Sequence, residues 1–289
     1  MTAEARARWP WAALTVVAAC SMACSAARDI EAGRAALDSH DLSTAERSFR
    51  AALDREPANT AALGGLGWTY LLAGQREVAG STFTRCLDVD PRMADCLRGL
   101  ARVATAAGEL GEARALLARA KAEAPDDLRV DASMALLALA SGDVADAAAR
   151  YERLVALAPD VTEYQLGAAE CAMRQSRPLD AIAAVDTLLT GTGLPVRQRA
   201  VALQLKARAL LSATEGREDP NDCAATAPPL RAWLDAAESA AQEADALGLG
   251  LPELPAVRRQ IHRRRAVIDN LCPEAQPSAA QLLAAPPAP

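Results

Sequence analysis

The sequence predicts an all-α fold, a solenoid of antiparallel helix pairs closed by a C-terminal capping helix. Three observations predict it. Alanine and leucine supply most of the apolar content and only 3% of the 289 residues are aromatic, which favours helices with closely packed small side chains. Prolines recur every 34 residues, at positions 57, 91, 125 and 159. Small and large apolar residues repeat in the same register, so one structural unit occurs several times.

The second helix of each unit is indicated by three apolar columns at spacings of four and three, which place their members on one helical face. The residues of the first column are small, and those of the second column are large. The columns are Ala45, Ala79, Ala113 and Ala147; then Phe49, Phe83, Leu117 and Tyr151; then Ala52, Cys86, Ala120 and Leu154.

The first helix of a unit is clearest in "LGWTY" (66–70), where Leu66, Gly67 and Tyr70 share a face. Turn residues separate it from the second helix, as in "AGQ" (73–75), "AGE" (107–109) and "SGD" (141–143). These patterns resemble the tetratricopeptide repeat (TPR) family, whose 34-residue signature is W-x2-L-G-x2-Y…A-x3-F…P. The resemblance implies a right-handed superhelical solenoid. Five units run over 26–195, the fifth with Gly193 in place of the proline.

Stacking follows from the physics of such units. Each hairpin leaves an apolar face that only a neighbouring hairpin can cover, so at least three must stack. The small residue lets two helices approach and the large residue fills the groove beside it. Proline ends the second helix because its ring clashes with the preceding turn and it lacks an N–H donor.

The pattern becomes irregular after residue 195. We expect the first helix of a sixth unit over 196–213, a polar loop over 214–229 and a partner helix over 230–247. A capping helix with a polar outer face is predicted over 255–272, as terminal repeats require. The low-complexity tail, 273–289, is predicted to be disordered.

The N-terminus, 1–23, has the pattern of a lipoprotein-type signal segment. Two arginines precede a short apolar run, which is shorter than the about 20 residues needed to span a bilayer. "VAAC" (17–20) resembles a bacterial lipobox, which implies acylation of Cys20; "SMAC" makes Cys24 the alternative. The following residue is serine in both cases, which favours the outer membrane by resemblance to proteobacterial sorting rules. A cleaved secretory signal without lipid is the other interpretation.

Cysteine usage fits an exported chain. Cys86 and Cys96 stand five residues either side of Pro91 and would lie at one height in two antiparallel helices, so a disulfide is sterically reasonable. The alternative is a pair of small core residues. A disulfide between Cys223 and Cys272 could similarly link the inserted loop to the capping helix. Cys171 is not assigned to a pair.

A partner-binding groove is implied by the TPR resemblance, because first-helix residues of that family line a concave surface. Two glycines one turn before Trp68 would leave its ring uncovered, and an exposed Trp beside Arg is the composition of a binding hot spot. Arg98 and Arg102 could hold a carboxylate in bidentate fashion. The alternative places Trp68 in the core and leaves both arginines solvated. The implied groove residues are Arg34, Trp68, Arg98, Arg102, Leu136, Leu139, Glu170, Met173 and Arg174.

Composition argues against several functions. The net charge of −6 gives no basic face for nucleic acid. No Cys/His cluster indicates a metal, and neither a P-loop nor a nucleophile elbow indicates an enzyme or a bound cofactor. The acids of the loop, Glu215, Glu218, Asp219 and Asp222, do not match an EF-hand. The basic run 258–265 suits the solvated outer face of an amphipathic helix better than a site for phosphate groups or an acidic partner.

The sequence therefore favours a non-catalytic interaction scaffold that binds a protein partner, tethered to a membrane of the bacterial cell envelope and facing the periplasm. Envelope TPR lipoproteins that this layout resembles help to assemble outer-membrane, pilus or secretion machines. A soluble periplasmic or cytoplasmic adaptor, or a regulatory subunit of an envelope enzyme, is the alternative. The oligomeric state is left open.

Overall fold

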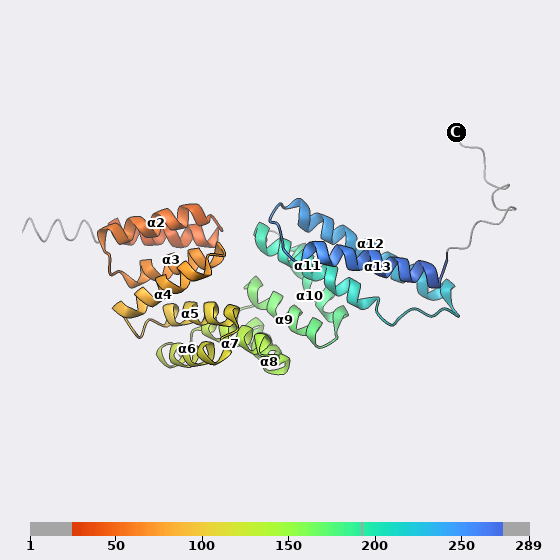
Figure 1. Cartoon of the computed structure of the whole chain (residues 1–289), viewed down its shortest axis with the longest axis horizontal. Coiled ribbons are helices and arrows are strands. Elements are labelled where there is room, and N and C mark those ends of the chain that lie inside the picture. The colour runs from red at the N-terminus through yellow and green to blue at the C-terminus, as the bar shows by residue number, and fades with distance from the viewer. Residues whose placement is uncertain (1–24, 192, 274–289) are drawn as a thin grey trace, which may run out of the picture. The chain divides into compact units, whose positions relative to one another are not determined.

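A computed structural model describes residues 25–191 and 193–273, and the regular secondary structure of these residues is helical (Figure 1). The chain forms two compact units, Met1–Leu154 and Val155–Pro289.

The first unit begins with a helical segment at 25–38. It continues with α2 (Leu42–Arg55), α3 (Thr60–Leu72), α4 (Arg76–Val89), α5 (Ala94–Ala107), α6 (Leu110–Glu123) and α7 (Leu128–Ala140), and the boundary between the units falls within the last turn of α8 (Val144–Leu157). The second unit contains α9 (Thr162–Arg174), α10 (Pro178–Thr190), α11 (Val196–Ala213), α12 (Cys223–Ala246) and α13 (Leu254–Leu271).

The helices start in strict 34-residue register. The first helices of successive repeats, α3, α5, α7, α9 and α11, begin at residues 60, 94, 128, 162 and 196. The second helices, α2, α4, α6, α8 and α10, begin at residues 42, 76, 110, 144 and 178. The predicted periodicity is confirmed, and it continues through the start of the irregular C-terminal region.

The turn between the two helices of a repeat places one residue in the left-handed region. Gly74, Gly108 and Gly142 have φ of 79°, 82° and 83°. The equivalent positions in the first and fifth repeats hold His40 and Ser176, with φ of 61° and 59°. Glycine adopts this conformation at little cost, whereas a side chain is strained there.

The three predicted apolar columns form the core of the repeats. All their members are at most 4% exposed. The ring of Phe49 lies against Gly33 and Gly65, and the ring of Phe83 lies against Gly67 and Gly99. Each of these two phenylalanine rings thus packs between first helices one repeat apart, because glycine leaves room for it.

The C-terminal region differs from the prediction in one respect. The predicted loop 214–229 is wrong beyond residue 222, because α12 already starts at Cys223 and carries Pro228 and Pro229 within its helix. Asp222 caps this helix by accepting a hydrogen bond from the Ala225 N–H (3.3 Å). The helix predicted over 196–213 is confirmed as α11. The capping helix is α13, which packs on α11 and α12.

Candidate functional site

The candidate interaction surface of the first unit is built from first helices. Within that unit α3 contacts α5, and α5 contacts α7. We call the side of these three helices that carries Trp68, Asp95, Arg98, Asp127 and Arg129 the first-helix surface.

Trp68 and Arg98 join successive repeats on this surface. The Arg98 guanidinium carbon lies 3.9 Å from the centroid of the Trp68 ring, a cation–π distance. Asp95 binds both side chains: its Oδ2 accepts a hydrogen bond from Trp68 Nε1 (3.1 Å), and its Oδ1 accepts one from Arg98 Nη2 (2.6 Å). The edge of Trp68 also meets Phe83, with centroids 5.4 Å apart.

A third repeat extends this polar network. Arg129, near the start of α7, donates two hydrogen bonds to Asp127 (3.0 and 2.8 Å) and approaches Asp95 at 3.8 Å. Burial alone would raise the pKa of Asp127, but hydrogen bonds from Arg129 outweigh it and hold the pKa below its ordinary value. Burial lowers the pKa of Arg98 although Asp95 opposes the shift.

Two expectations for this surface need correction. The glycines beside Trp68 predict an uncovered ring, but Arg98 lies over one face of it and the residue is half-buried. The spacing of Arg98 and Arg102 predicts a joint clamp on a partner's carboxylate, but Arg98 already binds Asp95 and its side chain is only 12% exposed. Trp68 and Arg98 are therefore held in the first-helix surface by contacts with each other and with Asp95.

The other implied groove residues of the first unit fall into different environments. Arg34 is exposed on the segment 25–38, and Arg102 and Leu136 are half-buried on α5 and α7. Leu139 is buried and belongs to the core, which corrects its assignment to the groove.

The implied groove residues of the second unit lie on α9. Glu170 pairs with Arg174 on the same helix (3.1 Å) and with Arg208 on α11 (3.0 Å). Met173 is half-buried against the apolar cluster of α9, α10 and α11. Glu170 thus links two consecutive first helices, as Asp95 does in the first unit.

Comparisons with known proteins agree with this architecture. Models described as tetratricopeptide repeat match residues 30–85 and 133–193 in one case and residues 73–137 in another. Together they cover residues 30–193, more than half of the chain. The chain belongs to the tetratricopeptide repeat family. Among curated proteins, none matches the chain in sequence.

Solved structures share the TPR fold. PilF of Pseudomonas aeruginosa has 18% identity and a TM-score of 0.50, covering 83% of this chain and 99% of that chain. PilW, described as a widely conserved type IV pilus biogenesis factor, has 16% identity and a TM-score of 0.54, covering 80% and 97%. TTC0263, a TPR protein of Thermus thermophilus, has 21% identity and a TM-score of 0.56, covering 64% and 99%. TPR proteins are in general non-catalytic modules that bind proteins through the repeat surface.

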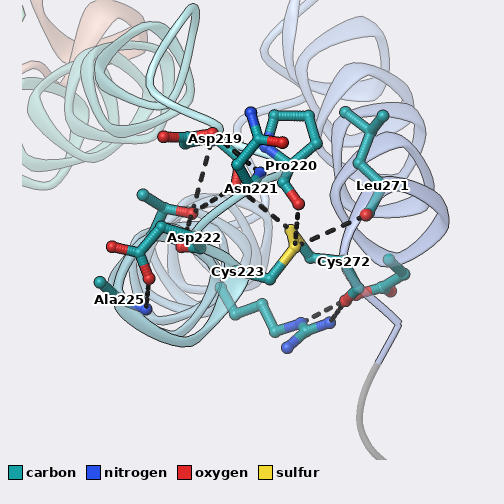
Figure 2. Close-up of a disulfide and its surroundings, with 11 residues drawn as sticks. Asp219, Pro220, Asn221, Asp222, Cys223, Ala225, Leu271 and Cys272 are labelled. Atoms are coloured by element: carbon teal, nitrogen blue, oxygen red, sulfur yellow. Dashed lines mark hydrogen bonds and ion pairs between the residues drawn. A yellow bond between two sulfur atoms is a disulfide. The ribbon is translucent and has the colours of Figure 1, made fainter.

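Two disulfides join neighbouring helices of the chain. Cys86 and Cys96 are bonded (S–S 2.03 Å) and join α4 to α5 across the Pro91 turn. Cys223 and Cys272 are bonded (S–S 1.93 Å) and join the start of α12 to the residue after α13. Figure 2 shows this second bond between the two chain segments, with the carbonyl oxygens of Pro220 and Leu271 each 3.6 Å from Cys223 Sγ. Cys171 is a buried thiol.

Three acids of the α11–α12 loop, Glu218, Asp219 and Asp222, have structural partners. Glu218 forms an ion pair with Arg264 of α13, which lowers the pKa of Glu218 through the hydrogen bonds from the guanidinium. Asp222 caps α12, and Asp219 accepts a hydrogen bond from the backbone N–H of Asn221 (2.9 Å). Across residues 25–191 and 193–273, no group of three or more His, Cys, Asp or Glu side chains is arranged to hold a metal ion.

The proposed acylation sites, Cys20 and Cys24, lie outside the described residues, as do the signal segment and almost all of the tail. In the part of the chain that is described, no helix combines the length and apolar character needed to cross a membrane.

Sequence reasoning missed the residues that connect the repeats. Asp95, Arg129 and Arg208 join neighbouring first helices, and Asp127 binds Arg129 at the start of α7. One local signal was present, because Asp95 stands three residues before Arg98 and residues at that spacing face each other on a helix.

Proposed function

We propose that the chain is a protein–protein interaction scaffold, tethered to a membrane of the bacterial cell envelope through an acyl group on Cys20, with Cys24 as the alternative. The observation that carries the proposal is the first-helix surface, where side chains of three consecutive repeats are held together by Trp68, Asp95 and Arg129. A surface fixed in this way loses little conformational entropy when a partner binds.

The tether and the compartment are supported by two features. The lipobox-like "VAAC" follows a short apolar run at the N-terminus. The cysteine pairs are arranged as disulfides, and disulfides persist in oxidising compartments such as the bacterial periplasm. Several acyl chains on one residue bind a bilayer firmly, since each buried CH₂ contributes about 0.8 kcal/mol. The serine that follows each candidate cysteine favours the outer membrane.

The machine that the scaffold serves is proposed by analogy. PilW is described as a type IV pilus biogenesis factor, and it shares the TPR fold with this chain over most of the length of both proteins. We therefore propose, by this analogy of fold, that the chain aids assembly of an outer-membrane, pilus or secretion machine.

Capture of partners from chemically crosslinked envelopes tests the scaffold. The chain offers a matched control, because Trp233 also has an arginine over its ring, Arg217 at 5.2 Å. We expect Trp68→Ala to lose proteins that wild type and Trp233→Ala both retain, with all three chains folded by circular dichroism. Identical captured proteins from all three would contradict a role for the first-helix surface.

Labelling with a fatty-acid analogue tests the tether. We expect wild type to carry label and to sediment with outer membranes, and Cys20→Ala to lose both. If Cys20→Ala keeps both and Cys24→Ala loses them, the anchor is Cys24. If neither change removes the label, or wild type takes up none, the proposed lipid anchor is wrong.

A further inference from the structure

The capping helix α13 carries an exposed ridge of four residues spaced by four. Arg259 and Arg263 are exposed, and Val267 and Leu271 are 42% and 41% exposed. Residues four apart form one of the ridges by which helices pack into each other's grooves. We call these four residues the α13 ridge. The first two residues of the ridge along the chain are cationic, and the last two are aliphatic.

The other arginines of α13 are already neutralised by the second unit. Arg258 pairs with Glu238 (3.0 Å), Arg264 with Glu218, and Arg265 with Asp235 (2.5 Å). Within the described residues no ion pair involves Arg259 or Arg263. The basic run 258–265 is therefore divided between residues that hold α13 in place and two that present charge to solvent.

The α13 ridge runs from the outer side of the helix, at its arginines, to the margin of the packed side, at its aliphatic residues. Val257, Ile261 and Ile268 are buried and seat α13 in the core that it shares with α11 and α12. At 100° per residue, Arg259 and Arg263 lie about 180° and about 140° around the helix from the centre of this buried stripe, and Val267 and Leu271 lie about 100° and about 60° from it. Terminal repeats need a polar outer face, and here Arg259 and Arg263 belong to it. Val267 and Leu271 continue the ridge at the margin of that face, where both remain exposed.

We propose that the α13 ridge is a docking site for an acidic amphipathic helix of a partner protein. Two carboxylates four residues apart on that helix would pair with Arg259 and Arg263, and two aliphatic residues four apart would pack on Val267 and Leu271. Charge complementarity selects the partner, because Arg259 and Arg263 are exposed and form no ion pair within the described residues. The ridge geometry selects a helix, since ridges pack into helix grooves.

A membrane surface fits the ridge less well. An interfacial helix needs an apolar face that runs along its whole length and is flanked by cations. In the α13 ridge the apolar part covers only the last two turns, and the cations precede it along the helix axis.

The proposal can be tested with designed peptides. The probe is a helical peptide with two Glu and two Leu residues, each pair spaced by four, and its counterpart has Lys in place of Glu. We expect the full-length chain to bind the Glu peptide in fluorescence anisotropy. Arg259→Glu with Arg263→Glu should weaken that binding by about tenfold or more, as the loss of two exposed ion pairs predicts, and should create binding of the Lys peptide.

A matched control is Arg114→Glu with Arg153→Glu, exposed arginines of α6 and α8 whose reversal changes the net charge equally. Equal weakening by this control, or no binding of the Glu peptide by wild type, would overturn the proposal. The proposal would also be overturned if the chain binds phosphatidylglycerol vesicles through Arg259 and Arg263 but does not bind the Glu peptide. That result would identify a membrane surface as the occupant. A dimer in sedimentation that Arg259→Glu with Arg263→Glu abolishes would identify a second copy as the occupant instead.

Discussion

Arg98 stacks on Trp68 across two repeats, and Asp95 binds both of them. The guanidinium carbon lies 3.9 Å from the ring centroid, and the carboxylate accepts one hydrogen bond from each partner. Trp68 belongs to α3, whereas Arg98 and Asp95 belong to α5, so the contact fixes one first helix against the next. The surface that we propose for partner binding is thus organised by interactions within the protein.

Removing Asp95 should destabilise the first unit strongly. The Arg98 side chain is 12% exposed, and a buried charge that loses its partner costs about 3 kcal/mol or more. We expect Asp95→Ala to lower the free energy of unfolding by about that amount in urea titrations. Adding Arg98→Met should recover part of the loss, because no charge then remains buried. Strictly additive losses in the double variant would show that the pair is not coupled.

Gly99→Ala should be among the most damaging small substitutions. A Cβ at this position would lie 2.3 Å from the Phe83 ring, and overpacking of this kind costs about 1–3 kcal/mol. Phe83→Leu should restore most of the stability. The next repeat supports this expectation, because it combines Leu117 with Ser133 at the position equivalent to Gly99.

The control for this prediction is Gly111→Ala in α6, where the added Cβ would meet nothing within 4 Å. We expect a gain of up to about 1 kcal/mol there, because alanine favours helix over glycine. Thermal melting of the three variants separates the outcomes. A Gly99→Ala melting temperature equal to that of wild type would contradict the tight contact.

Ser176→Gly should stabilise the fifth repeat. Ser176 has φ of 59° where three other repeats place glycine, and this conformation costs a side chain about 1 kcal/mol. Part of that gain is offset by the greater freedom of glycine in the unfolded chain, so we expect about 0.5 kcal/mol from thermal melting. Gly142→Ala, at φ of 83°, should have the opposite effect. The same sign for both changes would refute the argument.

The cap of α2 should make stability depend on acid pH. Hydrogen bonds from the Thr44 side chain and N–H, and then from Ser43, lower the pKa of Asp41 from 3.8 to about 2. Because the folded pKa lies below the unfolded one, the contribution is complete above the unfolded value and is lost as pH falls through about 2. The difference in melting temperature between wild type and Asp41→Ala should therefore shrink between pH 4 and pH 2. A carboxyl carbon NMR titration of Asp41 with its midpoint at the ordinary value would disprove this.

The two disulfides should respond differently to reductant. Cys86 and Cys96 are fully buried, whereas Cys223 is half-buried, so a mild dithiol should open Cys223–Cys272 first. Chain entropy predicts a loss of about 4 kcal/mol for Cys223→Ser with Cys272→Ser, from a separation of 49 residues, against about 3 kcal/mol for the other pair, from a separation of 10. Mass spectrometry of alkylated thiols gives the order. Simultaneous opening of both bonds would count against accessibility as the deciding factor.

The repeat architecture could be predicted from sequence because it depends on spacing. The columns of alanine and large apolar residues locate the helices in register. Proline marks the helix ends, because it stands two positions after the last residue of α2, α4, α6 and α8. The start of α12 was missed for a local reason. Pro228 and Pro229 usually end a helix, but here a cap at Asp222 begins the helix and a disulfide at Cys223 holds it.

The surface chemistry could be predicted only in part. Trp68 and Arg98 were identified, yet the stacking of one on the other depends on how α3 and α5 approach, which no spacing within one helix reports. Leu139 followed the family's groove positions but is buried in this chain. Pairings between repeats, such as that of Glu170 with Arg208, require the superhelix itself.

Site-specific photo-crosslinking in living cells tests the central claim most directly. A photoreactive amino acid at Arg34 or Leu136 would report on the positions assigned to the groove, and the same probe at Arg114 or Arg153 would report on exposed sites of second helices. We predict adducts to one set of envelope proteins from Arg34 and Leu136 and none from the two control positions. Adducts from Arg114 and Arg153 alone would contradict the account, because partners would then bind the second helices.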